Sequence, residues 1–146
     1  MIPIGKKGKG KRLKGKVEFG TSDNYDINEH MAIERFEDSI AWQKSKVLCV
    51  TVYKQFENSK DFGFKDQIQR AAVSVMNNIA EGFERKGNKE FAYFLYVAKG
   101  SCGEVRSMLI LAKELNKISE DVQKTLSALA EEVSKIISGL IKSIST

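Results

Sequence analysis

The fold is decided by residues 67–104, which read QIQRAAVSVMNNIAEGFERKGNKEFAYFLYVAKGSCGE. Apolar residues recur in this stretch at the spacing of helix turns, on both sides of a break at residues 86–87. The earlier run comprises Ile68, Ala72, Val75, Ile79 and Phe83, and the later run continues from Phe91 through Leu95, Ala98, Cys102, Val105 and Leu109 to Ala112. Two amphipathic helices joined by so short a break pack as antiparallel neighbours. We therefore predict two long helices that face each other across a tight turn.

Two further helices flank this pair. Towards the N-terminus, apolar residues form two adjacent stripes, one of Phe36, Ile40, Val47 and Val50 and one of Trp42, Cys49, Tyr53 and Phe56. Towards the C-terminus the pattern comprises Val122, Leu126, Leu129, Val133, Ile136 and Leu140. All three connections are short, which favours antiparallel neighbours. The sequence predicts an all-α protein, an antiparallel up-down-up-down four-helix bundle over residues 34–146.

The connections carry residues typical of helix ends. We expect Gly87 to take the left-handed position that closes the second helix and Asn88 to cap the third. Asn116 is expected to close the third helix. Ser119, which precedes two acidic residues, is expected to cap the fourth.

The N-terminal residues have a different composition. The net charge of the chain is +5, yet residues 1–16 contain seven basic residues and no acid, so residues 17–146 carry 5 − 7 = −2. The seven are Lys6, Lys7, Lys9, Lys11, Arg12, Lys14 and Lys16. We predict a basic, disordered tail over residues 1–33, which either binds nucleic acid or only increases solubility. Met31 resembles a natural translation start, so residues 1–30 are interpreted as an upstream extension.

Polar and small residues are expected where the second and third helices touch. Counting outward from the turn places Arg70 opposite Glu104, and we predict an ion pair there. Asn78 and Glu81 would extend it into a structural network; a catalytic acidic cluster is the less favoured interpretation. The glycines at positions 100 and 103 would allow the two backbones to approach closely.

The third helix is apolar around its whole circumference over residues 91–98. A bundle helix needs one apolar stripe, so the surplus surface with Tyr93, Phe94 and Tyr96 requires another partner. We predict that it contacts a neighbouring subunit. The alternative is that these aromatic side chains fill a wide core.

Few residues of the sequence are candidates for catalysis. The single histidine, His30, lies outside the predicted bundle, which argues against a di-iron site of Glu-x-x-His pairs and against a nucleophile with a histidine base. P-loop, G-x-G-x-x-G and H-E-x-x-H patterns are lacking, and we predict no catalytic residue, cofactor or metal. Cys49 and Cys102 are expected to be buried apolar residues of a reducing compartment. No apolar run is long enough to span a membrane, so we expect a cytoplasmic protein.

The chain resembles a known family over residues 36–141. The resemblance rests on RAAVSV at 70–75, NIAEG at 78–82 and the later EF, FL, GS and Glu104. It is to the four-helix-bundle proteins encoded in intervening sequences of bacterial 23S rRNA genes. Met76 stands where that family often has proline, and residues 64–65 stand where it often has a Ser or Thr cap. The resemblance implies a homopentamer, remotely similar to accessory barrel proteins of diversity-generating retroelements, which bind nucleic acid and a reverse transcriptase.

Two classes of function follow. The first is a homo-oligomer that binds RNA or DNA through the tail cations and through Arg85, Lys86 and Lys89 at the turn, where many weak phosphate contacts add up. Arg70 and Lys99 are further basic candidates. The second is a scaffold or accessory subunit that contacts a protein partner and no nucleic acid.

Overall fold

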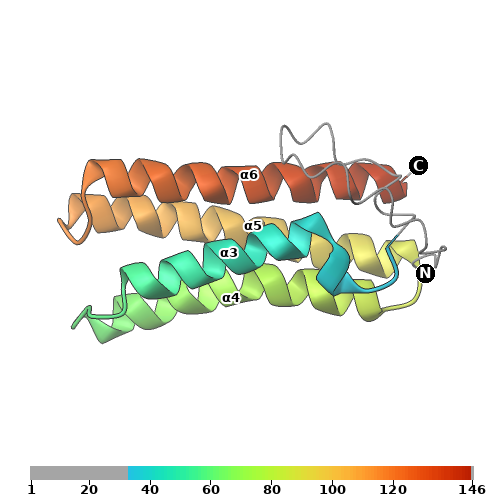
Figure 1. The fold of residues 1–146 in the computed structure, drawn as a ribbon, viewed down its shortest axis with the longest axis horizontal. Helices are drawn as coiled ribbons and strands as arrows, with labels where there is room; N and C mark the ends of the chain where they lie inside the picture. The colour runs from blue at the N-terminus through green and yellow to red at the C-terminus, as the bar shows by residue number, and fades with distance from the viewer. Residues whose placement is uncertain (1–32, 146) are drawn as a thin grey trace.

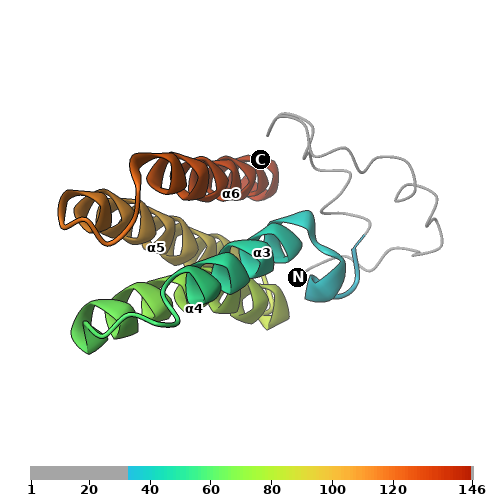
Figure 2. The ribbon, with the colours of Figure 1, turned by 60° about the vertical axis from the view of Figure 1, so that its left-hand side comes forward.

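The computed structural model describes residues 33–145 as four long helices preceded by a short 3-10 turn (Figure 1). The elements are η3 (Phe36–Asp38), α3 (Ile40–Gln55), α4 (Phe62–Glu84), α5 (Asn88–Glu114) and α6 (Glu120–Ser145). Contacts join α3 to α4, α4 to α5, α5 to α6 and α6 back to α3. The predicted up-down-up-down bundle is confirmed, with α3 and α5 across its diagonal (Figure 2).

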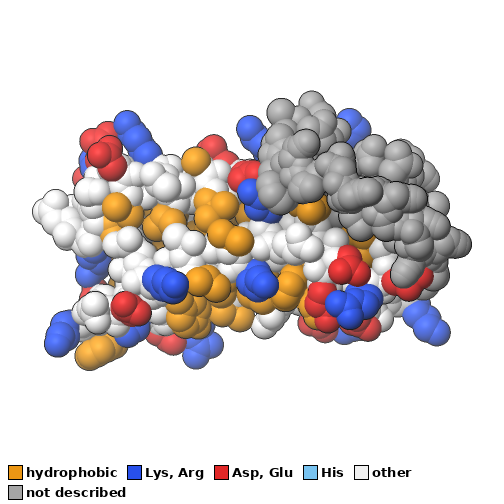
Figure 3. Space-filling model, in the orientation of Figure 1, with side chains coloured by type: hydrophobic (Ala, Val, Ile, Leu, Met, Phe, Trp, Pro, Cys, Tyr) orange, Lys and Arg blue, Asp and Glu red, His pale blue; other side chains and the backbone are white. Residues whose placement is uncertain are grey.

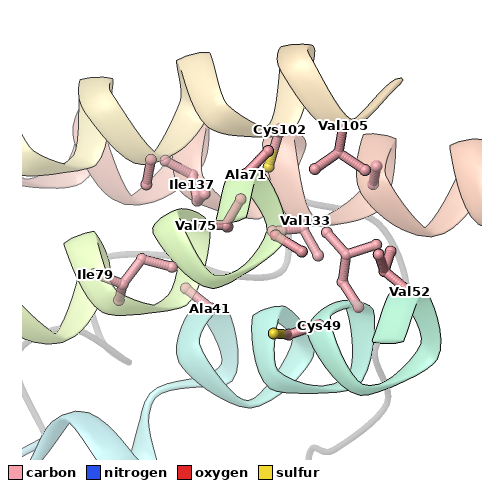
Figure 4. Close-up of a cluster of buried hydrophobic side chains, with 14 of the residues drawn as sticks. Ala41, Cys49, Val52, Ala71, Val75, Ile79, Cys102, Val105, Val133 and Ile137 are labelled. Atoms are coloured by element: carbon pink, nitrogen blue, oxygen red, sulfur yellow. The ribbon is translucent and has the colours of Figure 1, made fainter. Parts of the chain in front are cut away.

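All four helices contribute side chains to one continuous core (Figure 4). Val52, Val75, Val105, Val133 and Ile137 are fully buried and come from α3, α4, α5 and α6. Burying an aliphatic side chain of this size stabilises the fold by about 1.5–3 kcal/mol relative to leaving it in water. The alternating direction of the helices brings these residues together along the bundle axis.

The side of α3 that faces the core differs from our expectation. Val47, Val50 and Tyr53, which we assigned to buried stripes, are 48%, 47% and 42% exposed. Leu48 and Val52 fill the core instead, and both are fully buried. Because α3 is apolar on more than one side, its sequence periodicity does not select the inner face. The packing of α3 against α4 and α6 decides which face of α3 is buried.

Two of the predicted helix ends are confirmed. Asn116 has a φ of 59°, the left-handed conformation expected of a residue that closes a helix. The amide of Lys117 then donates to the carbonyl of Ala112 over 2.8 Å, as in a Schellman motif. At the start of α6, the Ser119 hydroxyl accepts a hydrogen bond from the amide of Val122 at 3.1 Å.

The turn between α4 and α5 differs in detail from the prediction. Helix α4 ends at Glu84 because Arg85 is extended, with a φ of −83° and a ψ of 157°. Gly87 has a φ of +90° but directly precedes α5 and so does not close α4. Asn88 is the first residue of α5, so its predicted capping role was wrong. The turn itself lies where the sequence indicated.

Candidate association and nucleic-acid surfaces

A polar cluster joins α4 and α5 near their middle. The hydroxyl oxygens of Ser74 and Ser101 lie 2.8 Å apart. The Asn78 side-chain amide donates to the Ser74 carbonyl at 2.8 Å and to the Ser74 hydroxyl at 3.0 Å. Because Ser101 is 9% exposed, its hydroxyl needs a partner within the protein. The cluster therefore favours one register between the two helices.

The Arg70–Glu104 ion pair expected at this junction does not form. Arg70 pairs with Asp66 at 2.9 Å, one turn earlier in α4, and its side chain is 78% exposed. Glu81 likewise pairs with Arg85 within the same part of the chain, at 2.8 Å. A partner four residues away on the same helix is always within reach, whereas a partner on another helix depends on the register. Among the predicted network residues, Asn78 alone belongs to the cluster, and Glu104 is exposed.

Sequence reasoning missed the two serines because it assigned an ion pair to this junction. The count that set Arg70 opposite Glu104 would set Ser74 opposite Gly100, whereas the structure sets Ser74 opposite Ser101, one residue further along α5. Two hydroxyl side chains among the small residues of facing helices were the available signal. Arg85 is extended and Gly87 directly precedes α5, so the turn offers no fixed point from which the register can be counted to a single residue.

Close approach of α4 and α5 occurs at a glycine that we had not singled out. A Cβ added to Gly82 would lie 2.7 Å from the Cβ of Phe94 and 3.0 Å from a ring carbon of Phe91. A Cβ on Gly100 or Gly103 would meet nothing within 4 Å. The expectation that these two glycines allow the helices to approach was therefore wrong. The packing of α4 against α5 gives no reason for a missing side chain at either position.

The outer side of α5 carries a long apolar surface, which we call the α5 stripe. It consists of Tyr93, Tyr96, Val97, Gly100, Glu104, Ser107, Ile110, Leu111, Glu114 and Leu115. Tyr93 and Tyr96 are 63% and 61% exposed, so they do not fill the core. Phe94, the third residue predicted for this surface, is half-buried, with its ring edge-on to Tyr93 at 5.2 Å. Large apolar side chains gathered on one exposed face are typical of an association surface.

The basic residues at the α4–α5 turn do not form a separate positive patch. Arg85 is held by Glu81, and its guanidinium lies 4.8 Å from the centre of the Phe94 ring. Lys86 and Lys89 are exposed and form no ion pair within residues 33–145. The acidic residues at this end of the bundle are Glu34, Glu37, Asp38, Glu81, Glu84 and Glu90. Their charge weakens the attraction of the turn for phosphate groups.

The seven predicted tail cations, Lys6, Lys7, Lys9, Lys11, Arg12, Lys14 and Lys16, lie outside the described residues. Ile33, which we had assigned to the tail, is 4% exposed and belongs to the core. It precedes η3, which contacts α3 and α4 at the end of the bundle where α4 turns into α5 (Figure 1). The tail sequence therefore joins the bundle at the same end as Arg85, Lys86 and Lys89.

The two cysteines have environments that suppress reactivity. Cys102 is fully buried and Cys49 is 7% exposed. Burial raises the pKa of both thiols, that of Cys102 to about 12, so neither is a ready thiolate at neutral pH. Within residues 33–145, no cluster of three or more His, Cys, Asp or Glu side chains is arranged to hold a metal ion. None of the helices in that range combines the length and apolar character needed to cross a bilayer.

These features define an antiparallel four-helix bundle with an exposed apolar stripe on α5. The chain belongs to the 23S rRNA-intervening sequence protein family, whose sequence pattern matches residues 37–139. Its fold is similar to the crystal structure of a protein of unknown function, assigned to the S23 ribosomal protein family, from Bacteroides thetaiotaomicron VPI-5482. That similarity has a TM-score of 0.67 at 23% sequence identity and covers 70% of this chain and 99% of the other. No curated protein matches the chain significantly.

Proposed function

We propose that this protein is a non-enzymatic homo-oligomer that binds RNA or DNA through basic side chains. Self-association is the part that the geometry supports best, and the exposed α5 stripe carries it. Tyr93 and Tyr96 are both more than three-fifths exposed, and the same helix also exposes Val97, Ile110, Leu111 and Leu115. The family resemblance suggests five subunits, and we propose a cytoplasmic location for the assembly.

Nucleic-acid binding rests on the charge of the tail and on multivalency. Each subunit brings seven cations within residues 1–16, and an oligomer brings several such segments to one assembly. Lys86 and Lys89 lie at the same end of the bundle as Ile33, the first described residue, so they are further candidates for phosphate contact. Individually weak phosphate contacts gain affinity when several subunits engage one strand. The acidic residues around the turn make the tail the larger contributor.

The experiment compares the full chain with a variant in which all seven tail cations are replaced by Gln. We expect the wild type to bind single-stranded RNA and duplex DNA at low salt with little sequence preference. Its affinity should fall with rising salt, with a slope of about −0.9 per neutralised phosphate on duplex DNA. The variant should bind more weakly and with a shallower slope.

A matched control replaces Lys124, Lys135 and Lys142 on the outer side of α6 by Gln, which also lowers the charge but leaves the tail intact. This control should change the salt slope little. If the tail variant retains both affinity and slope, the tail is not the site and the basic turn residues take its place. Failure of the wild type to bind either nucleic acid at low salt would overturn the nucleic-acid part of the proposal.

A second candidate function is a scaffold or accessory subunit without nucleic-acid contact. The observation that favours it is the mixture of acids and bases at the α4–α5 turn, since the folded bundle offers no strongly positive face there. The α5 stripe would then receive a different protein. Such a protein would compete with self-association, because both would use Tyr93 and Tyr96.

A further inference from the structure

Helix α3 carries a second exposed apolar surface, which we call the α3 stripe. It consists of Gln43, Lys46, Val47, Val50, Tyr53 and Lys54. Its three apolar members are the residues that were wrongly expected in the core, and each is more than two-fifths exposed. Figure 3 views the molecule from the side on which α3 lies in front. Hydrophobic and basic side chains lie next to one another along the middle of that face (Figure 3).

The α3 and α5 stripes face away from each other. Helix α3 packs against α4 and α6, and α5 packs against the same two helices from across the diagonal (Figure 2). Each stripe is the outward side of its own helix, so one molecule cannot bring them together. A second copy can. A contact between two different surfaces leaves one of each unused on every pair, so it repeats until a ring closes or a filament grows.

The charges on the two stripes are complementary. Helix α3 contains no acidic residue, and its stripe contributes Lys46 and Lys54. The α5 stripe contributes Glu104 and Glu114 and no basic residue. The helical rise places the two lysines about 12 Å apart and the two glutamates about 15 Å apart, close enough for both pairs to meet across helices that cross at a shallow angle. An α5-on-α5 contact would instead bring glutamates together.

Each of these charges remains available for a partner. Lys46 lies 5.3 Å from the centre of the Trp42 ring, on the exposed side of α3. Glu114 contacts its neighbour Lys113 at 3.3 Å and is still 66% exposed. Lys54 and Glu104 are exposed and have no ion pair in the described part of the chain. The four groups can therefore pair across an interface without breaking a buried contact.

The shape of the α5 stripe also suits a neighbouring helix. Gly100 lies midway between Tyr96 and Glu104, and a Cβ added there would meet no atom within 4 Å. Glycine is unfavourable inside a helix, and no contact among residues 33–145 requires it at that position. A flat place beside a tyrosine offers room for a large side chain from another copy. Tyr53 is the largest side chain of the α3 stripe.

We propose that the α5 stripe of one copy packs on the α3 stripe of the next, with Lys46 and Lys54 facing Glu104 and Glu114. This inference rests on the proposed self-association and adds the identity of the receiving surface. The apolar residues between the charges exclude water, and the charges select α3 over other surfaces. The assembly is then head-to-tail, and every copy contributes both stripes.

The test uses charge reversal in the full chain, followed by sedimentation velocity at low and high salt. The variants are K46E/K54E, E104K/E114K and the quadruple variant that combines them. Each double variant should weaken association about tenfold or more at low salt, because like charges would then face each other. The quadruple variant restores opposite charges at every contact and should assemble about as well as the wild type. High salt should reduce all of these differences.

The matched control is K135E/K142E, which makes the same change of charge on α6 and should leave association unchanged. Circular dichroism of each variant checks that the bundle is folded. If the wild type assembles and K46E/K54E assembles equally well, the α3 stripe is not the partner and the inference is overturned, while self-association stands. Failure of the quadruple variant to recover would also overturn it. A wild type that stays monomeric would refute the proposed self-association itself.

Discussion

Lys117 in the α5–α6 turn donates a hydrogen bond to Asp61 in the α3–α4 loop, with 2.9 Å between its Nζ and the carboxylate Oδ2. The other carboxylate oxygen of Asp61 accepts from the amide of Phe64 at 3.1 Å and so caps α4. One side chain therefore caps a helix and joins two connections at the same end of the bundle. The cap lies just before residues 64–65, where family resemblance had suggested that a capping residue was missing.

This arrangement predicts a pH-dependent stability. The hydrogen bond from Lys117, and secondly that from the Phe64 amide, lowers the pKa of Asp61 below its usual 3.8. A group with a lowered pKa in the folded state stabilises the fold above its unfolded-state pKa and loses that contribution as pH falls through the folded-state value. Asp61→Asn keeps a capping oxygen but removes the charge. Urea midpoints of this variant should lie below those of the wild type at pH 6.

The difference between wild type and Asp61→Asn should shrink as pH falls below 3.8. Asp121→Asn, in the exposed first turn of α6, is the control variant, because it also replaces an aspartate by asparagine but leaves Asp61 and Lys117 intact. A gap between wild type and Asp61→Asn that stayed constant from pH 6 down to about pH 2 would show that the charge of Asp61 is irrelevant to stability.

Gly82→Ala should destabilise the bundle by about 1–3 kcal/mol, because the added methyl group would overlap Phe94 and Phe91 of α5. Gly100→Ala serves as the matched comparison, since its Cβ would enter open space. It should stabilise the helix by about 0.5–1 kcal/mol. Both variants are measured by urea unfolding in a Tyr96→Glu background, so that self-association does not contribute to the measured stability. Equal effects at both glycines would contradict the packing of α4 on α5.

Ser74→Ala should cost about 1–2 kcal/mol of folding free energy, because it leaves the Ser101 hydroxyl without its partner in a nearly buried site. Ser101→Ala should cost less, because the Ser74 hydroxyl keeps the hydrogen bond from the Asn78 side chain. In the double variant both polar groups are gone, so its loss should be smaller than the sum of the single losses. A double-mutant cycle by urea denaturation measures this coupling. Strict additivity would mean that the two hydroxyl groups do not interact in solution.

Tyr93→Glu and Tyr96→Glu should weaken association much more than folding. Both side chains are exposed in the single chain, so a charge there meets water in the monomer. In an interface the same charge would be buried without a partner, which costs several kcal/mol. Phe91→Ala is the contrasting variant, because this fully buried ring should cost about 3–5 kcal/mol of folding stability. Native mass spectrometry and thermal melts separate the two effects.

Local sequence determined the number of helices and several of their ends. The helical spacing of apolar residues in α4, α5 and α6 depends on neighbours three and four positions apart, so it is readable from the sequence. The same is true of Asn116 and Ser119, whose roles rest on hydrogen bonds within a few residues. The surplus apolar face with Tyr93 and Tyr96 was also visible, because α5 has more apolar residues than one stripe can hold.

Tertiary structure decided what depends on the relative placement of helices. The Ser74–Ser101 contact needed the exact register of α4 on α5, which counting from the turn does not fix to one residue because Arg85 is extended. The inner face of α3 was selected by α4 and α6, since α3 offers apolar residues on both sides and its own periodicity is ambiguous. Arg70 pairs with Asp66 on its own helix and not with a residue across the junction. Short-range sequence patterns were therefore sufficient to predict the helices. Which surfaces of those helices remain exposed depends on how the helices pack together.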